Sequence, residues 1–137
     1  MKLFNSKTIA IANQKGGVGK TTTAVNIAAY LSITETPTLL IDMDPQANAT
    51  SGLGVEIDNN SKTIYDAIID EARPEECVHK TSLEYLDVIP STYSLVGAEI
   101  ELVSQMKRED RLKNVISELS GKYKYIIIDS APSLGLL

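Results

Sequence analysis

Short apolar runs alternate along this chain with longer segments of helical periodicity. The run from Thr38 to Asp42 is almost entirely apolar, as expected of a strand that is buried on both faces. β-branched residues predict another strand at residues 7–12. Two further strands are predicted near residues 85–89, ending at Pro90, and from Tyr123 to Asp129.

Apolar residues three and four apart predict helices between these strands. The predicted helices cover residues 20–33, about 63–71, 93–106 and 108–120, and a long loop runs from the second strand through Gly54. Gly121 is expected to stop the last helix. Strands separated by helices indicate an α/β fold: a mostly parallel sheet with right-handed crossovers and helices on both faces. Asp42 and Asp129 then lie at carboxyl ends of strands, where ligands of such sheets bind.

Composition supports one globular domain. The chain has 137 residues, of which 43% are hydrophobic and 23% charged. It has no apolar run of the roughly 18–20 residues that span a bilayer, and its first residues lack the pattern of a signal peptide. One cysteine, Cys77, cannot form an internal disulfide and fits a reducing compartment. We therefore expect a cytoplasmic protein that does not bind a membrane.

The net charge of −5 argues against a nucleic-acid-binding surface on this chain. Its basic residues gather only at Lys107, Arg108, Arg111 and Lys113. They share a helical pattern with four apolar positions, Leu112, Val115, Ile116 and Leu119. We interpret the basic residues as the solvated face of that helix.

The segment Lys15-Gly16-Gly17-Val18-Gly19-Lys20-Thr21-Thr22 carries the strongest chemical signal. It follows a predicted strand and opens a predicted helix. Glycines let successive backbone amides close around an anion, and a helix N-terminus adds unpaired N–H groups. We expect residues 16–22 to cradle phosphates, the Lys20 ammonium to reach the β- and γ-phosphates, and the Thr21 hydroxyl to ligate magnesium. These features predict binding of a nucleoside triphosphate.

This segment departs from the usual phosphate-binding loop at its start. The G-x-x-x-x-G-K-[ST] pattern requires glycine where this chain has Gln14, and Lys15 follows instead. A cation at the start of the loop is better placed to reach a phosphate bound by a neighbouring subunit than the phosphates beneath it. We expect Lys15 to act in that way. The alternative is an ordinary solvated lysine.

Three separated stretches resemble the deviant Walker A ATPases of the ParA/MinD family, in particular the ParA/Soj-like partition ATPases. They are Asn13 to Thr23, Asp42 to Gly54 and Ile126 to Ser133, with a weaker echo at Ala98 to Leu102. The resemblance implies a P-loop NTPase that hydrolyses ATP with Mg²⁺. It also implies an ATP-dependent homodimer, a centromere-binding ParB-like partner, and non-specific DNA binding on the nucleoid through regions beyond this chain. Ala47 stands where such proteins usually have glycine, so we expect its backbone to avoid strongly positive φ.

Three aspartates have candidate roles. Asp129 ends an apolar strand, as the Walker B carboxylate does, and is expected to hold magnesium directly or through water. Asp42 and Asp44 flank Met43, and we expect their side chains to point to opposite faces if the strand continues. The resemblance assigns to Asp44 a place near the attacking water and leaves Asp42 a structural part or an indirect role at the metal. The alternative for Asp44 is an Asx turn into Pro45.

The resemblance covers the N-terminal half of such an ATPase, so residues 1–137 are expected to be the N-terminal part of one P-loop domain, cut after the Walker B strand. The strand before the Gly-rich loop would then be an unpaired edge. Two other hypotheses remain. One is a different deviant Walker A enzyme, either a MinD-like division-site ATPase or a nitrogenase-iron-protein-like reductase. The other is a catalytically inert nucleotide-binding fragment. A reductase needs cluster-ligating cysteines, which Cys77 alone cannot supply. Asp42 to Thr50 favours the partition ATPase, although weak or absent turnover is expected of the chain alone.

Overall fold

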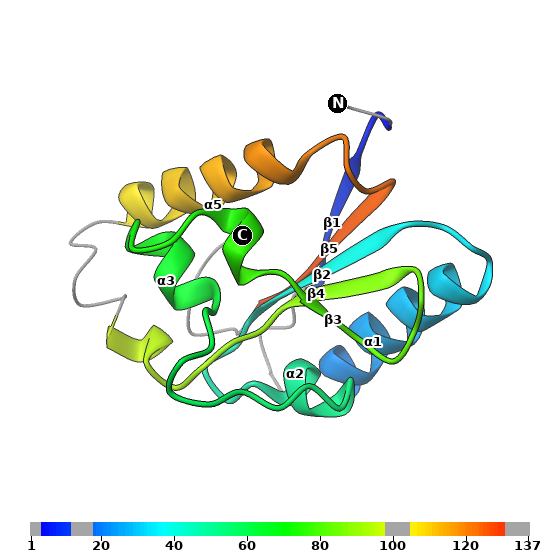
Figure 1. Ribbon diagram of the computed structural model, residues 1–137, viewed down its shortest axis with the longest axis horizontal. Coiled ribbons are helices and arrows are strands. Elements are labelled where there is room, and N and C mark those ends of the chain that lie inside the picture. Colours follow the sequence, from blue (N-terminus) through cyan, green and yellow to red (C-terminus); the bar gives the residue numbers. More distant parts are fainter. Residues whose placement is uncertain (1–3, 12–17, 98–104, 131–137) are drawn as a thin grey trace.

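One five-stranded sheet forms the centre of the molecule, with strand order β1-β5-β2-β4-β3 (Figure 1). The computed structural model describes residues 4–11, 18–97 and 105–130. Its strands are β1 (Lys7–Ile11), β2 (Thr38–Met43), β3 (His79–Lys80), β4 (Leu86–Ile89) and β5 (Tyr125–Ser130). β1, β5, β2 and β4 run parallel, and β3 pairs antiparallel with β4. The predicted mostly parallel sheet is confirmed.

Helices cover both faces of this sheet, as predicted. The described helices are α1 (Val18–Ile33), α2 (Asn48–Gly52), α3 (Ile64–Ile68), the short 3₁₀ helix η1 (Pro74–Cys77) and α5 (Gln105–Leu119). Figure 1 shows α1 and α2 on one side of the sheet and α3 and α5 on the other. We call these sides the α1 face and the α5 face.

Side chains alternate between the two faces along each buried strand. On β5, Ile127 packs in the α1-face core together with Leu40 of β2, whereas Ile126 and Ile128 pack in the α5-face core. All six side chains of β2 are buried. The uninterrupted apolar runs of the sequence are therefore strands covered on both sides.

α5 packs on the sheet through the apolar stripe that the sequence predicted. Leu112, Val115 and Leu119 are buried in the α5-face core, and Ile116 packs against it. Lys113 is exposed and Arg111 is half-buried. These two basic residues thus belong to the solvated side of the helix, as predicted.

Some predicted boundaries were wrong. α5 is continuous from Gln105, although we predicted a break between residues 106 and 108. Half of the predicted helix at 93–106, residues 98–104, lies outside the described residues; residues 95–97 are helical, and residues 105–106 belong to α5. α2 lies inside the predicted long loop, and η1 and β3 were not predicted. These three elements are only two to five residues long, too short for a periodic pattern.

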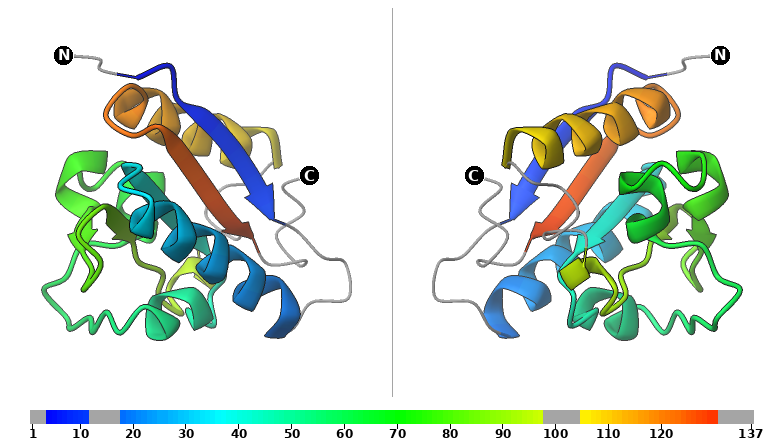
Figure 2. Two further views of the ribbon diagram at one scale, coloured as in Figure 1. Left: turned by 90° about the vertical axis from the view of Figure 1, so that its right-hand side faces the viewer. Right: turned by 90° about the vertical axis from the view of Figure 1, so that its left-hand side faces the viewer.

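β1 forms one edge of the described sheet. Within residues 4–11, 18–97 and 105–130 it pairs only with β5, and the two strands lie side by side in Figure 2. Four of its five residues are exposed, among them Ile9 at 37%. The described part of the chain therefore has the apolar edge strand that the sequence predicted.

Candidate functional site

The carboxyl ends of the parallel strands bring the candidate residues together. In the strand register Asp129 of β5 pairs with Ile11 of β1 on one side and with Asp42 of β2 on the other. β1 ends at Ile11 and α1 begins at Val18, so the Gly-rich segment connects the strand beside Asp129 to the start of α1. The first turn of a helix leaves N–H groups unpaired. Carboxylates and helix amides thus meet at one edge of the sheet.

Asp42 and Asp129 also share the α1 face. Each lies two residues beyond a side chain of the α1-face core, Leu40 on β2 and Ile127 on β5, and residues two apart in a strand point to the same side. Both aspartates are fully buried. Helix α1 covers this same face, so both carboxylates lie on the α1 side of the sheet.

Neutral donors surround the Asp42 carboxylate. Its Oδ1 accepts a hydrogen bond from the Asp44 amide at 3.0 Å. Its Oδ2 accepts from the Thr50 amide at 2.9 Å and from the Thr50 hydroxyl at 2.6 Å. Burial raises the pKa of Asp42 to about 6, against the opposing effect of these hydrogen bonds, and the nearby Asp129 charge raises it further. Both Asp42 oxygens are engaged by the protein, which suits an indirect role better than direct metal ligation.

The turn at Asp44 contradicts the expected directions of the Asp42 and Asp44 side chains, and it contains the Asx turn that was predicted as the alternative. Residues two apart in a strand share a face, so the expectation that Asp42 and Asp44 point to opposite faces was wrong; moreover, β2 ends at Met43. The Asp44 Oδ1 accepts from the Gln46 amide at 2.9 Å, which is an Asx turn. The Asp44 side chain is half-buried and lies at the carboxyl edge of the sheet.

Ala47 contradicts the sequence expectation. Its φ of 56° and ψ of 35° place it in the left-handed region, immediately before α2. The amide of Ala47 donates to the Asp44 carbonyl at 2.8 Å and its carbonyl accepts from Ser51 at 3.0 Å. The turn therefore imposes a conformation that costs an alanine about 1 kcal/mol.

Thr50 and Ser91 take part in contacts around Asp42 that the sequence did not reveal. The Thr50 hydroxyl accepts from the Ser91 amide at 3.0 Å while it donates to Asp42. Thr50 and Ser91 are both buried. Thr50 lies within the Asp42 to Gly54 stretch of the family pattern, but no role was predicted for it, and no motif marked Ser91. The available signal was physical: a carboxylate buried at the end of β2 requires donors from a nearby segment.

The structure describes only some of the other residues that were predicted for this site. Lys15, Gly16 and Gly17 lie outside the described residues. Val18, Gly19, Lys20, Thr21 and Thr22 lie in the first turns of α1, and of these only Thr22 has a described side-chain exposure, being exposed. Their contacts with a ligand therefore stay predictions.

The donor set at this edge fits magnesium. Mg²⁺ takes oxygen ligands and usually keeps several waters, with one or two carboxylates and substrate phosphates completing its shell. Asp129 lies beside the end of β1, and the backbone of Thr21 lies in the first turns of α1. These two residues, with nucleotide phosphates, would hold the ion.

A second buried carboxylate, Asp87 on β4, lies toward the opposite end of the sheet. It pairs in register with Leu39, near the start of β2. Its Oδ2 accepts from the Tyr123 hydroxyl at 2.7 Å, and Lys80 lies 3.3 Å from its Oδ1. Burial and the Asp87 contact raise the pKa of Tyr123. Asp87 therefore has a local cation and a phenol donor.

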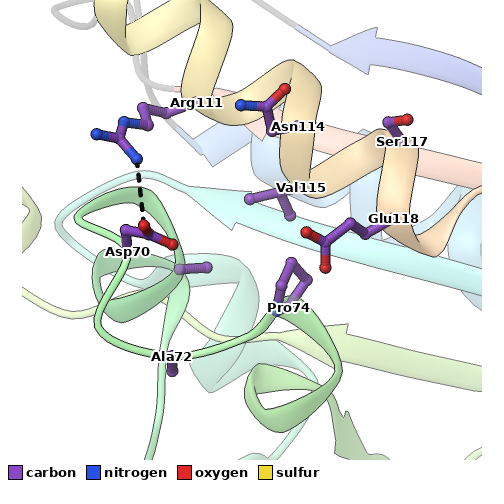
Figure 3. A pocket seen from close by; sticks show the side chains of 9 residues that line it. Asp70, Ala72, Pro74, Arg111, Asn114, Val115, Ser117 and Glu118 are labelled. Atoms are coloured by element: carbon purple, nitrogen blue, oxygen red, sulfur yellow. Dashed lines mark ion pairs between the residues drawn. The ribbon is translucent and has the colours of Figure 1, made fainter.

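A hollow on the α5 face shares no residue with this edge. It has a cavity volume of about 250 Å³ between the α3–η1 segment and α5 (Figure 3). Asp70 and Arg111 approach each other across it, at 3.8 Å. This hollow is distinct from the candidate nucleotide site.

No helix among the described residues is long and apolar enough to cross a membrane.

Comparisons with known proteins cover nearly the whole chain. A family model described as AAA domain matches residues 6–137. The chain is 57% identical over 129 residues to the chromosome partitioning protein ParA of Myxococcus xanthus, covering 94% of this chain and 46% of that protein. It is 53% identical over 131 residues to the sporulation initiation inhibitor protein Soj of Bacillus subtilis, covering 96% and 52%. The chain thus spans about half the length of these curated relatives.

Solved structures share the fold. A McdA–ATP complex from Cyanothece has a TM-score of 0.88 at 36% identity, covering 94% of this chain and 49% of that one. Cobyrinic acid a,c-diamide synthase from Mycobacterium smegmatis, with an ATP analogue and magnesium, has a TM-score of 0.87 at 36% identity, covering 96% and 53%. A plasmid partition protein from Borrelia burgdorferi has a TM-score of 0.81 at 33% identity, covering 93% and 56%. These are P-loop NTPase folds, and the predicted fold class is confirmed.

Proposed function

Because this chain belongs to the AAA domain family, we propose that the full-length protein carrying it is a ParA/Soj-like ATPase. It binds ATP with Mg²⁺, dimerises on ATP, hydrolyses it, and acts in chromosome or plasmid segregation. The observation that carries the proposal is the register at the carboxyl edge, where Asp129 lies between Ile11, the last residue of β1, and Asp42. Such an edge suits a phosphate-bound metal ion.

Each candidate residue has a part in this reaction. Backbone amides of residues 16–22 and the Lys20 ammonium hold the phosphates. Thr21 and Asp129 would hold Mg²⁺, which would offset negative charge on the phosphate oxygens. Asp44 positions the attacking water. Lys15 reaches the nucleotide of the partner subunit and offsets charge in the transition state.

The proposed partners follow from the kind of protein, not from a surface on this chain. They are a second copy bound through ATP, a centromere-binding ParB-like protein and non-specific DNA. The DNA contacts belong to regions beyond residues 1–137, since this chain has a net charge of −5 and the described basic side chains on α5 do not form a patch. The proposed location is the cytoplasm, on the nucleoid in the ATP state.

The choice of reaction rests on the sequence more than on the fold. A cobyrinic acid a,c-diamide synthase shares the fold at a TM-score of 0.87, so the fold accommodates other chemistry. The identities of 57% and 53% to ParA and Soj support partition instead.

Calorimetry on the full-length protein tests the proposal. Lys20→Ala should weaken binding of Mg²⁺–ATP by about 30-fold or more, because a phosphate loses a charged partner. Lys80→Ala is the matched control: Lys80 pairs with Asp87 toward the other end of the sheet, so its loss should leave affinity unchanged. Unchanged affinity in Lys20→Ala, or absence of ATP binding by the wild type, would refute the nucleotide assignment.

A further inference from the structure

The loop that carries Asp44 is closed on itself by hydrogen bonds. It leaves the sheet after Met43, the last residue of β2, and leads into α2. In α2 the Thr50 amide and hydroxyl both donate back to Asp42 Oδ2, at 2.9 and 2.6 Å. The other oxygen of the same carboxylate accepts from the Asp44 amide at 3.0 Å. One carboxylate thus joins the two ends of the loop to the backbone of Asp44.

Thr50 also anchors this loop to the rest of the fold. Its hydroxyl accepts from the Ser91 amide at 3.0 Å, in the segment that follows β4. Thr50 is 2% exposed, and Asp42 and Ser91 are fully buried. Because the hydroxyl donates to Asp42 and accepts from Ser91, a single buried group links the end of β2, helix α2 and the β4 exit.

We propose that Thr50 is a positioning residue for ATP hydrolysis, which holds the Asp42 carboxylate and, through it, the turn that carries Asp44. This inference rests on the proposed function. In that function, Thr50 contacts neither the nucleotide nor the attacking water. Its part is to fix the backbone of Asp44, so that the Asp44 carboxylate meets the attacking water in one place.

The remainder of the loop has little freedom to compensate. Pro45 fixes its own φ, the Gln46 amide donates to Asp44 Oδ1 at 2.9 Å, and Ala47 is in the left-handed region. A stiff loop moves as a unit when its anchor is lost. Small misplacements of a reacting group cost about 10- to 100-fold in rate.

A pair of substitutions isolates the hydroxyl. Thr50→Ser and Thr50→Ala both lose the γ-methyl, and only Thr50→Ala loses the hydroxyl that donates to Asp42 and accepts from Ser91. The backbone amide of residue 50 still donates to Asp42 in both variants. In the full-length protein we expect Thr50→Ser to keep kcat within about threefold, and Thr50→Ala to lose about 10-fold or more in kcat with KM for ATP nearly unchanged. Thr50→Val, which keeps the shape of the side chain, should give the same loss if Thr50→Ala does not fold.

The matched control is Thr38, at the start of β2, the strand that carries Asp42. Thr38 is also fully buried, and its hydroxyl donates to the Thr36 carbonyl at 2.8 Å. Thr38→Ser and Thr38→Ala repeat the same two changes away from Asp44. Both should leave kcat unchanged, even where Thr38→Ala lowers the melting temperature.

A double-variant cycle shows whether Thr50 acts through Asp44. In an Asp44→Ala background, measured by single turnover, Thr50→Ala should lower the rate by less than twofold, because the group that it positions is already absent. Amide hydrogen exchange on nucleotide-free protein should show faster exchange at Asp44 and Gln46 in Thr50→Ala than in Thr50→Ser. Multiplicative losses in the cycle, or unchanged exchange at both amides, would overturn the positioning role.

The outcomes also separate this inference from the proposed function. A wild-type protein without ATP hydrolysis refutes the function itself. A wild-type protein that hydrolyses ATP, with Thr50→Ala and Thr50→Val as active as Thr50→Ser, refutes only the role of Thr50.

Discussion

Two carboxylates are buried at opposite ends of the sheet, and they are satisfied in different ways. Asp87 has a lysine 3.3 Å away and a tyrosine hydroxyl donor at 2.7 Å. Asp42 has only neutral donors among the described residues, from Asp44 and Thr50, and burial raises its pKa to about 6. Asp129 lies beside Asp42 in the strand register.

This difference distinguishes a structural end of the sheet from the end proposed to bind the nucleotide. Buried charge is stable where the protein supplies its own counter-charge, as at Asp87. At the carboxyl end, two buried carboxylates lie together, and the described residues supply no such counter-charge to Asp42. A magnesium ion or the Lys20 ammonium would lower the cost of that arrangement. Substitutions at the carboxyl end should therefore change nucleotide chemistry, and substitutions at the amino end should change stability alone.

The largest expected effects come from the carboxyl end, at Asp44 and Asp129. Asp44→Ala should lower single-turnover hydrolysis by about 100-fold or more and leave Mg²⁺–ATP affinity intact, because it removes the group that we propose to position the attacking water. Asp129→Ala should instead weaken magnesium-dependent ATP binding, by about 10- to 100-fold. Calorimetry with and without Mg²⁺, beside single-turnover assays, measures both effects in the full-length protein.

Asp87→Asn serves as the control for that pair, since it neutralises a buried carboxylate at the other end. It should change neither binding nor hydrolysis in protein that remains folded. Equal losses of ATP affinity in Asp44→Ala and Asp129→Ala would contradict the division of roles at the carboxyl end.

An intermediate effect is expected at the amino end. Tyr123→Phe removes the hydroxyl donor from Asp87 and should destabilise the full-length protein by about 1.5 kcal/mol, the usual size for a hydrogen bond to a charged group. Urea denaturation measures the loss, and kcat should stay within twofold of the wild-type value. A large fall in kcat without loss of stability would mean that the two ends of the sheet are coupled.

The smallest expected effect comes from substitution by glycine at a left-handed residue, made once at each end of the sheet. Ala47, at the carboxyl end, and Glu35, after α1 at the amino end, have φ values of 56° and 58°. Glycine at either position should stabilise the protein by about 0.5 kcal/mol, since relief of the left-handed strain slightly exceeds the added entropy of the unfolded chain. Chemical denaturation of Ala47→Gly and Glu35→Gly measures the two values. Destabilisation by Ala47→Gly alone would show that the Ala47 side chain contributes packing that outweighs its strain.

The sequence predicted the elements whose pattern is long enough to have a period. The apolar runs of β2 and β5 and the stripe of α5 appeared where expected. Because parallel strands end at a common edge, the ends of these two runs were enough to predict that Asp42 and Asp129 lie together. The chemistry proposed for that edge comes from the Gly-rich segment, because phosphate binding needs particular residue types at fixed spacing.

Other features depend on contacts that no local pattern encodes. α2 has five residues and begins after Ala47, without a side-chain cap, so no start signal marks it. The left-handed Ala47 follows from the closure of the Asp42–Thr50 loop, not from alanine's own preference. The bridge from Thr50 to Ser91 joins residues that are 41 positions apart, and a hydrogen bond of that kind is decided only when the sheet assembles.

The strand order also constrains when the site can form during synthesis. β5, the last described strand, lies between β1 and β2, the first two. A nascent chain that has emerged only as far as β2 has a gap where β5 will insert, and premature pairing of β1 with β2 would have to be undone. Closing the loop between Ile11 and Asp129 carries the entropic cost of a long-range contact, which slows folding. The proposed nucleotide site is therefore completed only after β5 leaves the ribosome.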